Sequence, residues 1–453
     1  MRRFPDGFVW GASTSAYQIE GAVEEDGRGR SIWDTFTHTP GKIDGGGTGD
    51  VACDSYHRWR EDIEVLSQLG VNAYRFSFAW PRIQPSGSGP LEPRGVAHYE
   101  RLIDGLLERG IEPLVTLYHW DLPQALEDEG GWLNRDTAER FAEYSRICFD
   151  VYGDRVRRWI TVNEPWIVGL LGYRLGLHAP GLRDVRKEVT AFHHLLLAHG
   201  RAVQALRAST AGGSAGIANA LAPHYPHSDD TADVAAAAGS DGYVNRFFLD
   251  SVFNGSYPAD TLALFERVAG RLDFIRDGDL TVIATPSDFL GVNYYARRVM
   301  RADPERTPYP WEVVVDPDVP ATEAGTEITP SAFTDLLVRL ADDYDIPLLI
   351  TENGAVFGDG PAADGRVHDG RRVRYVESHL GAVHDAIARG ADVIGYCHWS
   401  LLDNFEWALG YAQRFGLVHV DYDTLERTIK DSGLYYSQIA RANALAAPEE
   451  VPA

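Results

Sequence analysis

RWITVNEP at residues 158–165 and PLLITENG at residues 347–354 are the two stretches that decide the fold. Each is a short run of β-branched and apolar residues, which is typical of a buried strand, and each breaks at a turn-forming Asn-Glu-Pro or Glu-Asn-Gly. Glu164 and Glu352 therefore close two predicted strands that lie far apart in the chain. Either glutamate alone would most simply be a surface residue at a strand end, but a closed fold would bring the two together.

Apolar segments of this kind recur along the whole chain, separated by stretches with helical periodicity that end at a glycine. The three clearest helical stretches are Ile63–Leu69 before Gly70, Tyr99–Leu107 before Gly110, and Val373–Ile387 before Gly390. A strand is predicted within a few residues of each of these glycines, as short connections from helix to strand require. The eight predicted strands are Phe8–Ala12, Ala73–Phe78, Leu114–Tyr118, Trp159–Val162, Gly216–Ala220, Phe289–Asn293, Leu348–Thr351 and Val393–Tyr396.

Eight repeats of strand, long loop, helix and glycine predict an α/β fold, a single (β/α)8 TIM barrel with long βα loops. The alternative, an open doubly wound sheet, would need a phosphate-binding glycine loop after the first strand, and the sequence has none there. We expect one catalytic domain over residues 1–453, with loop insertions at Ala232–Ala238 and Arg301–Glu327 and a frayed tail at Ala446–Ala453.

The composition restricts the partners and the compartment. Of the 453 residues, 42 are Lys or Arg and 66 are Asp or Glu, a formal net charge of −24 that argues against nucleic acid and anionic membranes. The charge is equally consistent with a solubility trait of the host organism. Cys53, Cys148 and Cys397 are odd in number and lack metal-ligand spacing, which favours a reducing compartment. With neither a signal-type apolar region nor a membrane-length apolar run in the sequence, we expect a cytoplasmic protein.

The side chains at the predicted strand ends are mostly amides, carboxylates and indoles. In barrels of this class the active site lies at the carboxyl ends of the strands. Such a set suits the binding of hydroxyl groups and the stacking of sugar faces, and two carboxylates are what glycosidic bond cleavage requires. We expect no metal and no cofactor, and a structural role for His193 and His194 in a helix. The strand-end residues are Gln18, Arg75, Trp80, His119, Trp120, Asn163, Glu164, Asn293, Tyr295, Glu352, Trp399, Glu406 and Trp407.

Several of these residues also have simpler structural interpretations. Arg75 could pair with any acid that borders the barrel, and Trp399 and Trp407 could be core aromatics, the usual fate of tryptophan. The position of Arg75 at a strand end and the polar neighbours of Trp407 favour the site. His119 is better suited to neutral hydrogen bonding beside Trp120 than to metal binding or proton transfer.

Seven motifs together resemble those of glycoside hydrolase family 1, the β-glucosidase family, in the family's order from Phe4 to about Asn443. They are FVWGASTSAYQIEG (8–21), YRFSFAWPRI (74–83), VTLYHWDLP (115–123), TVNEP (161–165), GVNYY (291–295), ITENG (350–354) and WSLLDNFEW (399–407). The resemblance implies that Glu164 is the catalytic acid/base and Glu352 the nucleophile. It implies sugar contacts from Gln18, His119, Trp120, Asn163, Asn293, Tyr295, Trp399, Glu406 and Trp407, with Arg75 beside the nucleophile and Trp166 on the aglycone side.

The implied activity is hydrolysis of terminal β-D-glucosyl residues, and of β-galactosyl or β-fucosyl residues if the site tolerates them, by double displacement with retention. Such enzymes take part in carbohydrate metabolism, including cellulose and other polysaccharide degradation. Retention requires the two carboxyl groups to lie about 5–5.5 Å apart, whereas about 6.5–9.5 Å indicates inversion. The only partner we expect is a small β-glycoside, and the sequence leaves the oligomeric state open.

Three alternatives stay open at this point. A 6-phospho-β-glucosidase would usually replace the Glu406-Trp407 pair and carry Lys and Tyr beyond it, where this chain has Gln413 and Phe415. A transglycosidase would share the same covalent intermediate. A non-catalytic sugar-binding barrel would lack one carboxylate, and both are present. The natural aglycone is also undetermined, because Arg301–Glu327 lies where aglycone-binding loops vary.

Overall fold

The computed structural model describes residues 2–445, so the predicted frayed tail lies outside the described residues. Eight parallel strands close into a barrel in the order β11-β12-β2-β3-β4-β5-β6-β8, and every predicted strand is present to within about three residues at each end. The fold prediction is therefore confirmed. The barrel strands are β2 (Val9–Ser13), β3 (Ala73–Ser77), β4 (Glu112–Tyr118), β5 (Arg158–Asn163), β6 (Ser214–Ala220), β8 (Phe289–Asn293), β11 (Leu348–Asn353) and β12 (Val393–Trp399).

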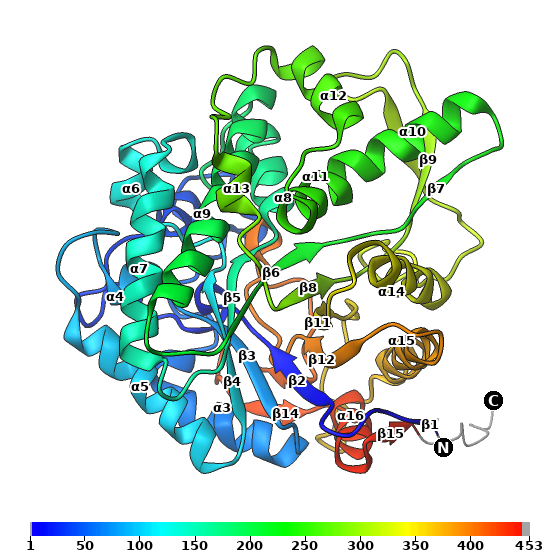
Figure 1. Ribbon diagram of the computed structural model, residues 1–453. Helices are drawn as coiled ribbons and strands as arrows, with labels where there is room; N and C mark the ends of the chain where they lie inside the picture. The colour runs from blue at the N-terminus through cyan, green and yellow to red at the C-terminus, as the bar shows by residue number, and fades with distance from the viewer. Residues whose placement is uncertain (1, 446–453) are drawn as a thin grey trace.

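Helices surround the barrel, with α3, α5, α7 and α9 on one side and α14 and α15 on the other (Figure 1). Gly70, Gly110 and Gly390 all have positive φ at the ends of α3, α5 and α15, as the predicted helix stops require. The larger helices are α3 (Ser55–Leu69), α5 (Pro93–Glu108), α7 (Asp136–Tyr152), α9 (Val185–Ala208), α12 (Ala259–Ala269), α14 (Pro330–Tyr344), α15 (Gly370–Ala388) and α16 (Asp431–Ala442). None of the helices in residues 2–445 is long and apolar enough to cross a membrane.

Shorter helices occupy the loops that follow the strands. They are α1 (Ala16–Ile19), α2 (Ile32–Thr37), α4 (Trp80–Ile83), α6 (Gln124–Asp128), α8 (Pro165–Ile167), α11 (Phe247–Leu249) and α13 (Asp279–Ile283). Of these, α1, α4 and α8 directly follow barrel strands, so their side chains lie near the carboxyl ends of the strands.

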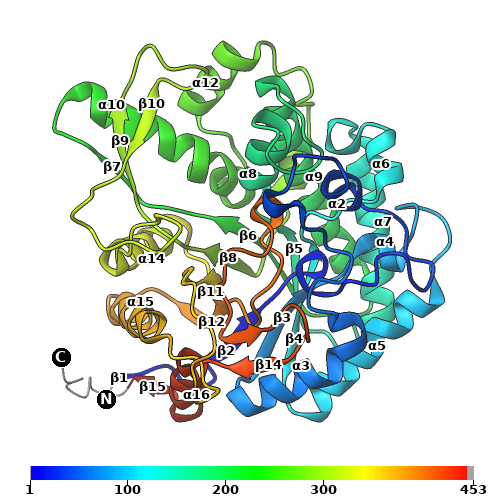
Figure 2. The same cartoon turned by 180° about the vertical axis from the view of Figure 1, so that it is seen from behind.

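Both predicted insertions lie in barrel loops, but each has regular structure. The Ala-rich segment lies in α10 (Thr231–Asp241), and the Arg301–Glu327 region contains the end of β9 (Arg298–Ala302) and all of β10 (Trp311–Val314). Together with β7 (His224–Pro226), these strands form a separate sheet in the order β10-β9-β7. Figures 1 and 2 show β7, β9 and α10 at one end of the molecule, beyond the carboxyl ends of β6 and β8.

The two ends of the described chain meet on the opposite side of the barrel from this sheet (Figure 2). There β1 (Arg2–Arg3) pairs antiparallel with β15 (Ala444–Leu445). A further antiparallel pair, β13 (Val418–Val420) and β14 (Arg427–Ile429), follows the loop that leaves β12. That loop carries Glu406 and Trp407, so this pair helps to position the candidate site.

Candidate active site

The predicted residues gather at the carboxyl end of the barrel. Of the thirteen residues to which the resemblance assigns a role, ten line one cavity of about 540 Å³, namely His119, Trp120, Glu164, Trp166, Asn293, Tyr295, Glu352, Trp399, Glu406 and Trp407. The other three, Gln18, Arg75 and Asn163, are fully buried and hydrogen-bond to residues of the cavity wall. Trp80, the remaining strand-end candidate, is buried in the aromatic core, where its ring stacks on Tyr144.

Glu352, on β11, is buried and receives a hydrogen bond on each carboxylate oxygen. Arg75 on β3 donates from Nη1 to Glu352 Oε1 at 2.5 Å, and the Tyr295 hydroxyl donates to Oε2 at 2.7 Å. The Arg75 guanidinium is completely buried, so its charge acts on Glu352 with little screening by water. These two hydrogen bonds hold both oxygens of the Glu352 carboxylate in place at the cavity wall.

Glu164 lies directly after β5 and has a different environment. Its φ of 50° is in the left-handed region, so the chain turns sharply where the carboxylate enters the cavity. One donor reaches it, the Asn293 side-chain amide at 2.8 Å from Oε1. Burial, and then the negative charge of Glu352, raise the pKa of Glu164 to about 8. The two glutamates thus differ in the way that an acid and a nucleophile must differ.

A chain of hydrogen bonds lies between Glu164 and Glu352, and it fixes how the side-chain amides of Asn163 and Asn293 are oriented. Arg75 can only donate, so the Asn163 atom that it contacts at 2.7 Å must be the carbonyl oxygen. That oxygen also accepts from Asn293 Nδ2 at 3.1 Å, and Asn293 Oδ1 accepts from the Thr351 hydroxyl at 2.6 Å. Each side chain therefore has one allowed orientation, and the chain of bonds holds Glu164 relative to Arg75 and Glu352.

The same network determines the tautomer of His119. Asn163 Nδ2 donates to His119 Nε2 at 3.1 Å, so Nε2 is the acceptor and the ring proton is on Nδ1. Burial and the charge of Arg75 keep the pKa of His119 well below its ordinary value, so the ring is neutral. Nδ1 is buried without a hydrogen-bond partner among residues 2–445, which leaves an N–H donor at the cavity wall.

Glu406 is placed by the loop that follows β12. Gln18 on α1 donates to Asn404 Oδ1 at 3.0 Å, to the Phe405 carbonyl at 2.9 Å and, more weakly, to Glu406 Oε2 at 3.5 Å. Burial, followed by the charge of Glu352, raises the pKa of Glu406 to about 8. Glu406 therefore offers the cavity a carboxyl group that can donate or accept a hydrogen bond near neutral pH.

Aromatic rings form much of the wall around these carboxyl groups. The His119 ring is stacked with Trp399 and Trp407, at centroid distances of 5.8 and 6.0 Å. The Trp120 indole N–H donates to the main-chain carbonyl of Asn163 at 3.0 Å. Contact of Trp120 with a sugar hydroxyl therefore stays a prediction. The Trp166 indole N–H is buried and has no partner among residues 2–445.

His193 and His194 lie in α9, away from the cavity. His193 contacts the Tyr257 hydroxyl and Asp279, each at 2.8 Å, and His194 Nδ1 donates to the Trp132 carbonyl at 2.9 Å. Both rings therefore have protein partners, in line with the structural role expected of them. The cavity wall has no cluster of three or more His, Cys, Asp or Glu side chains that could hold a metal ion, as far as the chain is described.

The comparison with known families agrees with this geometry, since the model of the family described as "Glycosyl hydrolase family 1" matches residues 1–445. The chain belongs to glycosyl hydrolase family 1. Beta-glucosidase A of Acetivibrio thermocellus is 47% identical over 443 residues, which are 97% of this chain and 98% of the relative. The bifunctional beta-D-glucosidase/beta-D-fucosidase of Bifidobacterium breve is 46% identical over 455 residues, with 96% and 97% of the two chains covered.

A solved structure shows the same family 1 fold. The beta-glucosidase from Thermotoga maritima in complex with castanospermine has a TM-score of 0.95 to this structure at 46% identity. The match covers 99% of this chain and 100% of that chain. As a member of family 1, the chain is a glycoside hydrolase on a (β/α)8 barrel.

Sequence reasoning placed Trp166 and the Arg301–Glu327 segment on the aglycone side but did not identify most residues of the outer part of the family 1 cavity. Apolar side chains and two arginines line it: Ile167, Leu171, Val244, Arg297, Arg298, Val313 and Val314. These residues come from loop helices and from the β9–β10 hairpin, which carry no strand-end signature. The one available signal was the position of Arg297 and Arg298, a few residues after Asn293 in the loop that follows β8.

Proposed function

We propose that this family 1 glycoside hydrolase is a retaining β-glucosidase that removes terminal non-reducing β-D-glucosyl residues. One observation carries the proposal: two buried carboxyl groups face one cavity in opposite electrostatic environments. Glu352 has a guanidinium and a phenol beside it, whereas Glu164 has a single amide donor and a raised pKa. The relatives named β-glucosidases support the same substrate class.

In the first step we assign Glu352 as nucleophile and Glu164 as acid. A Glu352 oxygen bonds to the anomeric carbon, the bond from that carbon to the aglycone oxygen breaks, and Glu164 gives its proton to the leaving oxygen. Asn293 occupies Glu164 Oε1, which leaves Oε2 to carry the proton. Tyr295 and Arg75 hold Glu352 in place for the attack.

In the second step the roles of the two groups reverse. Glu164 is now ionised and takes a proton from water, whose oxygen attacks the anomeric carbon and releases Glu352. Two inversions at one carbon give net retention. The loss of charge on Glu352 in the intermediate lowers the pKa of Glu164, because Glu352 is one of the groups that raise it. This coupling favours the base form at the step that needs it.

We assign the glycone-binding role to the residues that surround the two carboxyl groups. The free Nδ1–H of His119 and the carboxyl of Glu406 offer donors and acceptors for sugar hydroxyls, and Trp399 offers a ring face. Gln18, Asn163 and Asn293 have the amide chemistry for the same purpose, and Trp120, Trp407 and Tyr295 complete the wall. Trp166 borders the aglycone side.

Charge argues against a 6-phosphorylated sugar. Glu406 lies in the cavity beside Glu352 and Glu164, and Phe415 lines the wall beyond it. A phosphate there would meet the Glu406 carboxyl and the apolar Phe415 ring, neither of which supplies the positive charge that binds a phosphate. No observation favours transglycosylation or a non-catalytic role, since both carboxyl groups are present and face the cavity.

We also propose that the chain forms one catalytic domain and acts in the cytoplasm. The helices and the three smaller sheets of residues 2–445 all accompany one closed barrel. Cys53, Cys148 and Cys397 are all free and buried, which is consistent with a reducing compartment. The excess of acidic residues disfavours nucleic acid as a partner.

The test is initial-rate hydrolysis of p-nitrophenyl β-D-glucoside, β-D-galactoside, β-D-fucoside and 6-phospho-β-D-glucoside without added metal. We expect turnover of the unphosphorylated sugars, the glucoside among the best, and little of the 6-phosphate. The ratios among the three sugars report the preference at the 4- and 6-hydroxyls. A folded protein that hydrolyses only the phosphorylated substrate, or none of the four, would contradict the proposal.

A further inference from the structure

Arg298 is the first residue of β9 and lies at the outer wall of the active-site cavity. It lines the main cavity and also a smaller pocket of about 140 Å³ behind it. Its guanidinium lies over the ring of Trp166, 4.8 Å from the centroid. A guanidinium stacked in this way keeps its N–H edge free to donate in the plane of the group.

Arg298 differs from the neighbouring arginines because no acid pairs with it. Arg297 donates to Glu327 at 2.8 Å, and Arg301 pairs with Glu312. Within residues 2–445, no carboxylate lies within ion-pair distance of Arg298, and its guanidinium donates no hydrogen bond. Burial lowers the pKa of Arg298, and only the Tyr243 hydroxyl opposes that effect. A half-buried cation without a counter-ion has a strong electrostatic preference for an anion.

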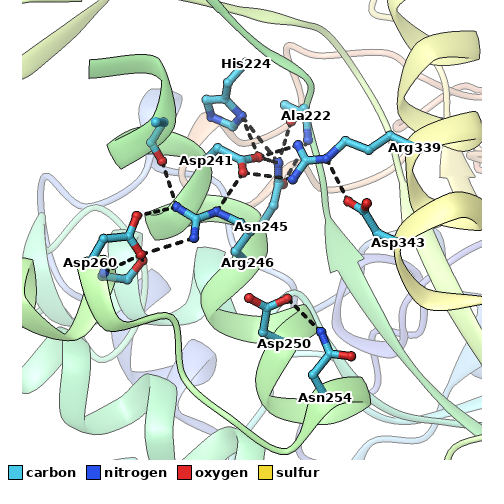
Figure 3. Close-up of polar contacts among 12 residues, drawn as sticks. Ala222, His224, Asp241, Asn245, Arg246, Asp250, Asn254, Asp260, Arg339 and Asp343 are labelled. Atoms are coloured by element: carbon cyan, nitrogen blue, oxygen red, sulfur yellow. Dashed lines mark hydrogen bonds and ion pairs between the residues drawn. The ribbon is translucent and has the colours of Figure 1, made fainter. Parts of the chain in front are cut away.

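The backbone around Arg298 is held by a polar network behind it. Arg298 N–H donates to the Pro223 carbonyl at 2.9 Å, and Arg298 pairs with His224 in the β7–β9 register. Figure 3 shows how the chain before His224 is fixed: Asn245 donates to the Ala222 carbonyl at 2.7 Å and to Asp241 at 2.7 Å.

Asp241, the centre of that network, is itself clamped by arginines. Arg339 on α14 donates to both of its oxygens, at 2.7 and 2.9 Å, and Arg246 donates at 3.1 Å (Figure 3). Arg246 reaches on to Asp260, and Arg339 to Asp343. Because these bonds tie β7 to α10 and α14, the strand that carries Arg298 has a fixed position at the cavity wall.

The charges along the cavity favour an anion at the outer end only. Glu164, Glu352 and Glu406 lie together at the other end, where three acidic side chains offer an anion no positive charge. The wall also carries apolar side chains, among them Ile167, Leu171, Val244 and Val313. A ligand that fits this sequence of surfaces has an uncharged sugar, then an apolar ring, then an anionic group.

We propose that Arg298 is a specificity-determining residue that binds the carboxylate of an aromatic aglycone. A carboxylate matches the planar N–H edge of a guanidinium and can accept two parallel hydrogen bonds from it. The aglycone ring would lie against the apolar wall, with its phenolic oxygen at the bond that is cleaved. This inference rests on the proposed β-glucosidase activity and adds the chemical class of its leaving group.

The test uses two substrates that differ only in charge, 4-carboxyphenyl β-D-glucoside and its methyl ester. The measured quantity is the ratio of kcat/KM for the acid to kcat/KM for the ester at pH 7, compared between variants. Differences in leaving-group reactivity cancel in that comparison. Arg298→Gln removes the charge, Arg298→Lys keeps it without the planar fork, and Arg301→Gln is the matched control on the same strand.

We expect the ratio to fall about 10-fold to 100-fold in R298Q, the range for a hydrogen bond to a charged group. The R298K ratio should lie between those of the wild type and R298Q, and the R301Q ratio should equal that of the wild type. In the wild type, raising NaCl from about 0.05 to about 0.5 M should lower the ratio, because salt screens the attraction. That measurement serves even if R298Q does not fold.

An R298Q ratio equal to that of the wild type, with the ester still hydrolysed, overturns the role of Arg298 and leaves the β-glucosidase assignment intact. An equal fall in R301Q would also overturn it, because the effect would then be one of net charge. A wild-type ratio that does not change with salt counts against it in the same way. Failure of the wild type to hydrolyse either substrate would instead reject the proposed function, and the inference with it.

Discussion

Glu352 accepts hydrogen bonds from Arg75 and Tyr295, and we propose that it is the nucleophile. Glu352→Ala removes the attacking oxygen but leaves the sugar-binding wall intact. We predict that kcat for p-nitrophenyl β-D-glucoside falls by more than about 10⁴-fold, the order seen when a covalent nucleophile is removed. Steady-state kinetics of the purified variant measure the loss.

Azide provides the control for this variant. The small anion can enter the space that the Glu352 side chain leaves and attack the anomeric carbon from the same face, to give α-glucosyl azide with inversion. Slow formation of that product shows that the E352A protein is folded and binds substrate. Full hydrolytic activity of E352A would disprove the assignment of the nucleophile.

As the proposed acid, Glu164 should control the pH dependence of the first step. Its acid form is the reactive one, and burial together with the charge of Glu352 raises its pKa to about 8, compared with about 4.3 for an unperturbed glutamate. We therefore predict that kcat/KM is maintained through neutral pH and falls as the pH rises through about 8. A pH–rate profile of the free enzyme measures this limb. A fall centred between pH 4 and 5 would contradict the assignment.

The same shift links the site to stability. Between the ordinary glutamate range and about pH 8, folded Glu164 keeps a proton that the unfolded chain has lost. The free energy of unfolding therefore decreases as the pH rises through this window, and the contribution of the site is largest below it. Glu406, whose pKa is also raised to about 8, acts in the same direction. The two buried carboxyl groups thus lower the free energy of unfolding as the pH approaches 8.

The loop from β12 to β13 is the element that brings Glu406 and Trp407 to the cavity. Asp403 anchors it: the buried carboxylate accepts from Lys430 Nζ at 2.8 Å, from Arg414 at 2.8 Å and from the Gly416 N–H at 2.9 Å. Lys430 and Asp403 have no exposed side-chain surface. A charge that loses its partner in such a place is strongly destabilising.

We predict that Lys430→Met lowers the free energy of unfolding by about 3–5 kcal/mol, the usual cost of breaking a buried pair from one side. Urea denaturation measures the change, and KM for the glucoside should rise because Glu406 lies three residues from Asp403. Arg146→Met is the matched control, since it breaks an i,i+4 pair with Asp150 in which both side chains are about half exposed. That change should cost less than about 1 kcal/mol. Equal effects of the two substitutions would contradict this account of the loop.

For the molecule as a whole, the barrel could be predicted because its strands are short, buried apolar runs and its helices stop at glycines. Every strand of a parallel barrel is covered on both faces, so β5 and β11 read as continuous apolar runs without polar alternation. The Glu164 and Glu352 positions followed from the same runs, because the strands end where the catalytic loops begin. Gly70, Gly110 and Gly390 marked helix ends because left-handed backbone favours glycine.

What the sequence could not supply is the set of contacts made between strands. The tautomer of His119 depends on Asn163, which depends on Arg75, and these three residues lie in or directly after three different strands. The β9–β10 hairpin was read only as an inserted loop, because its strands are short and half exposed and show little periodicity. The sequence also could not single out Arg298, because the absence of an acid partner is a property of the folded molecule.

We propose above all that Glu164 and Glu352 are positioned for double displacement with retention. The most direct test is ¹H NMR of the products while p-nitrophenyl β-D-glucoside is being hydrolysed, before the released sugar mutarotates. Our account predicts that β-glucose forms first and that the α-anomer appears only as mutarotation proceeds. Initial release of α-glucose would mean inversion, and with it a carboxyl separation of about 6.5–9.5 Å in place of about 5–5.5 Å. That result would contradict the account.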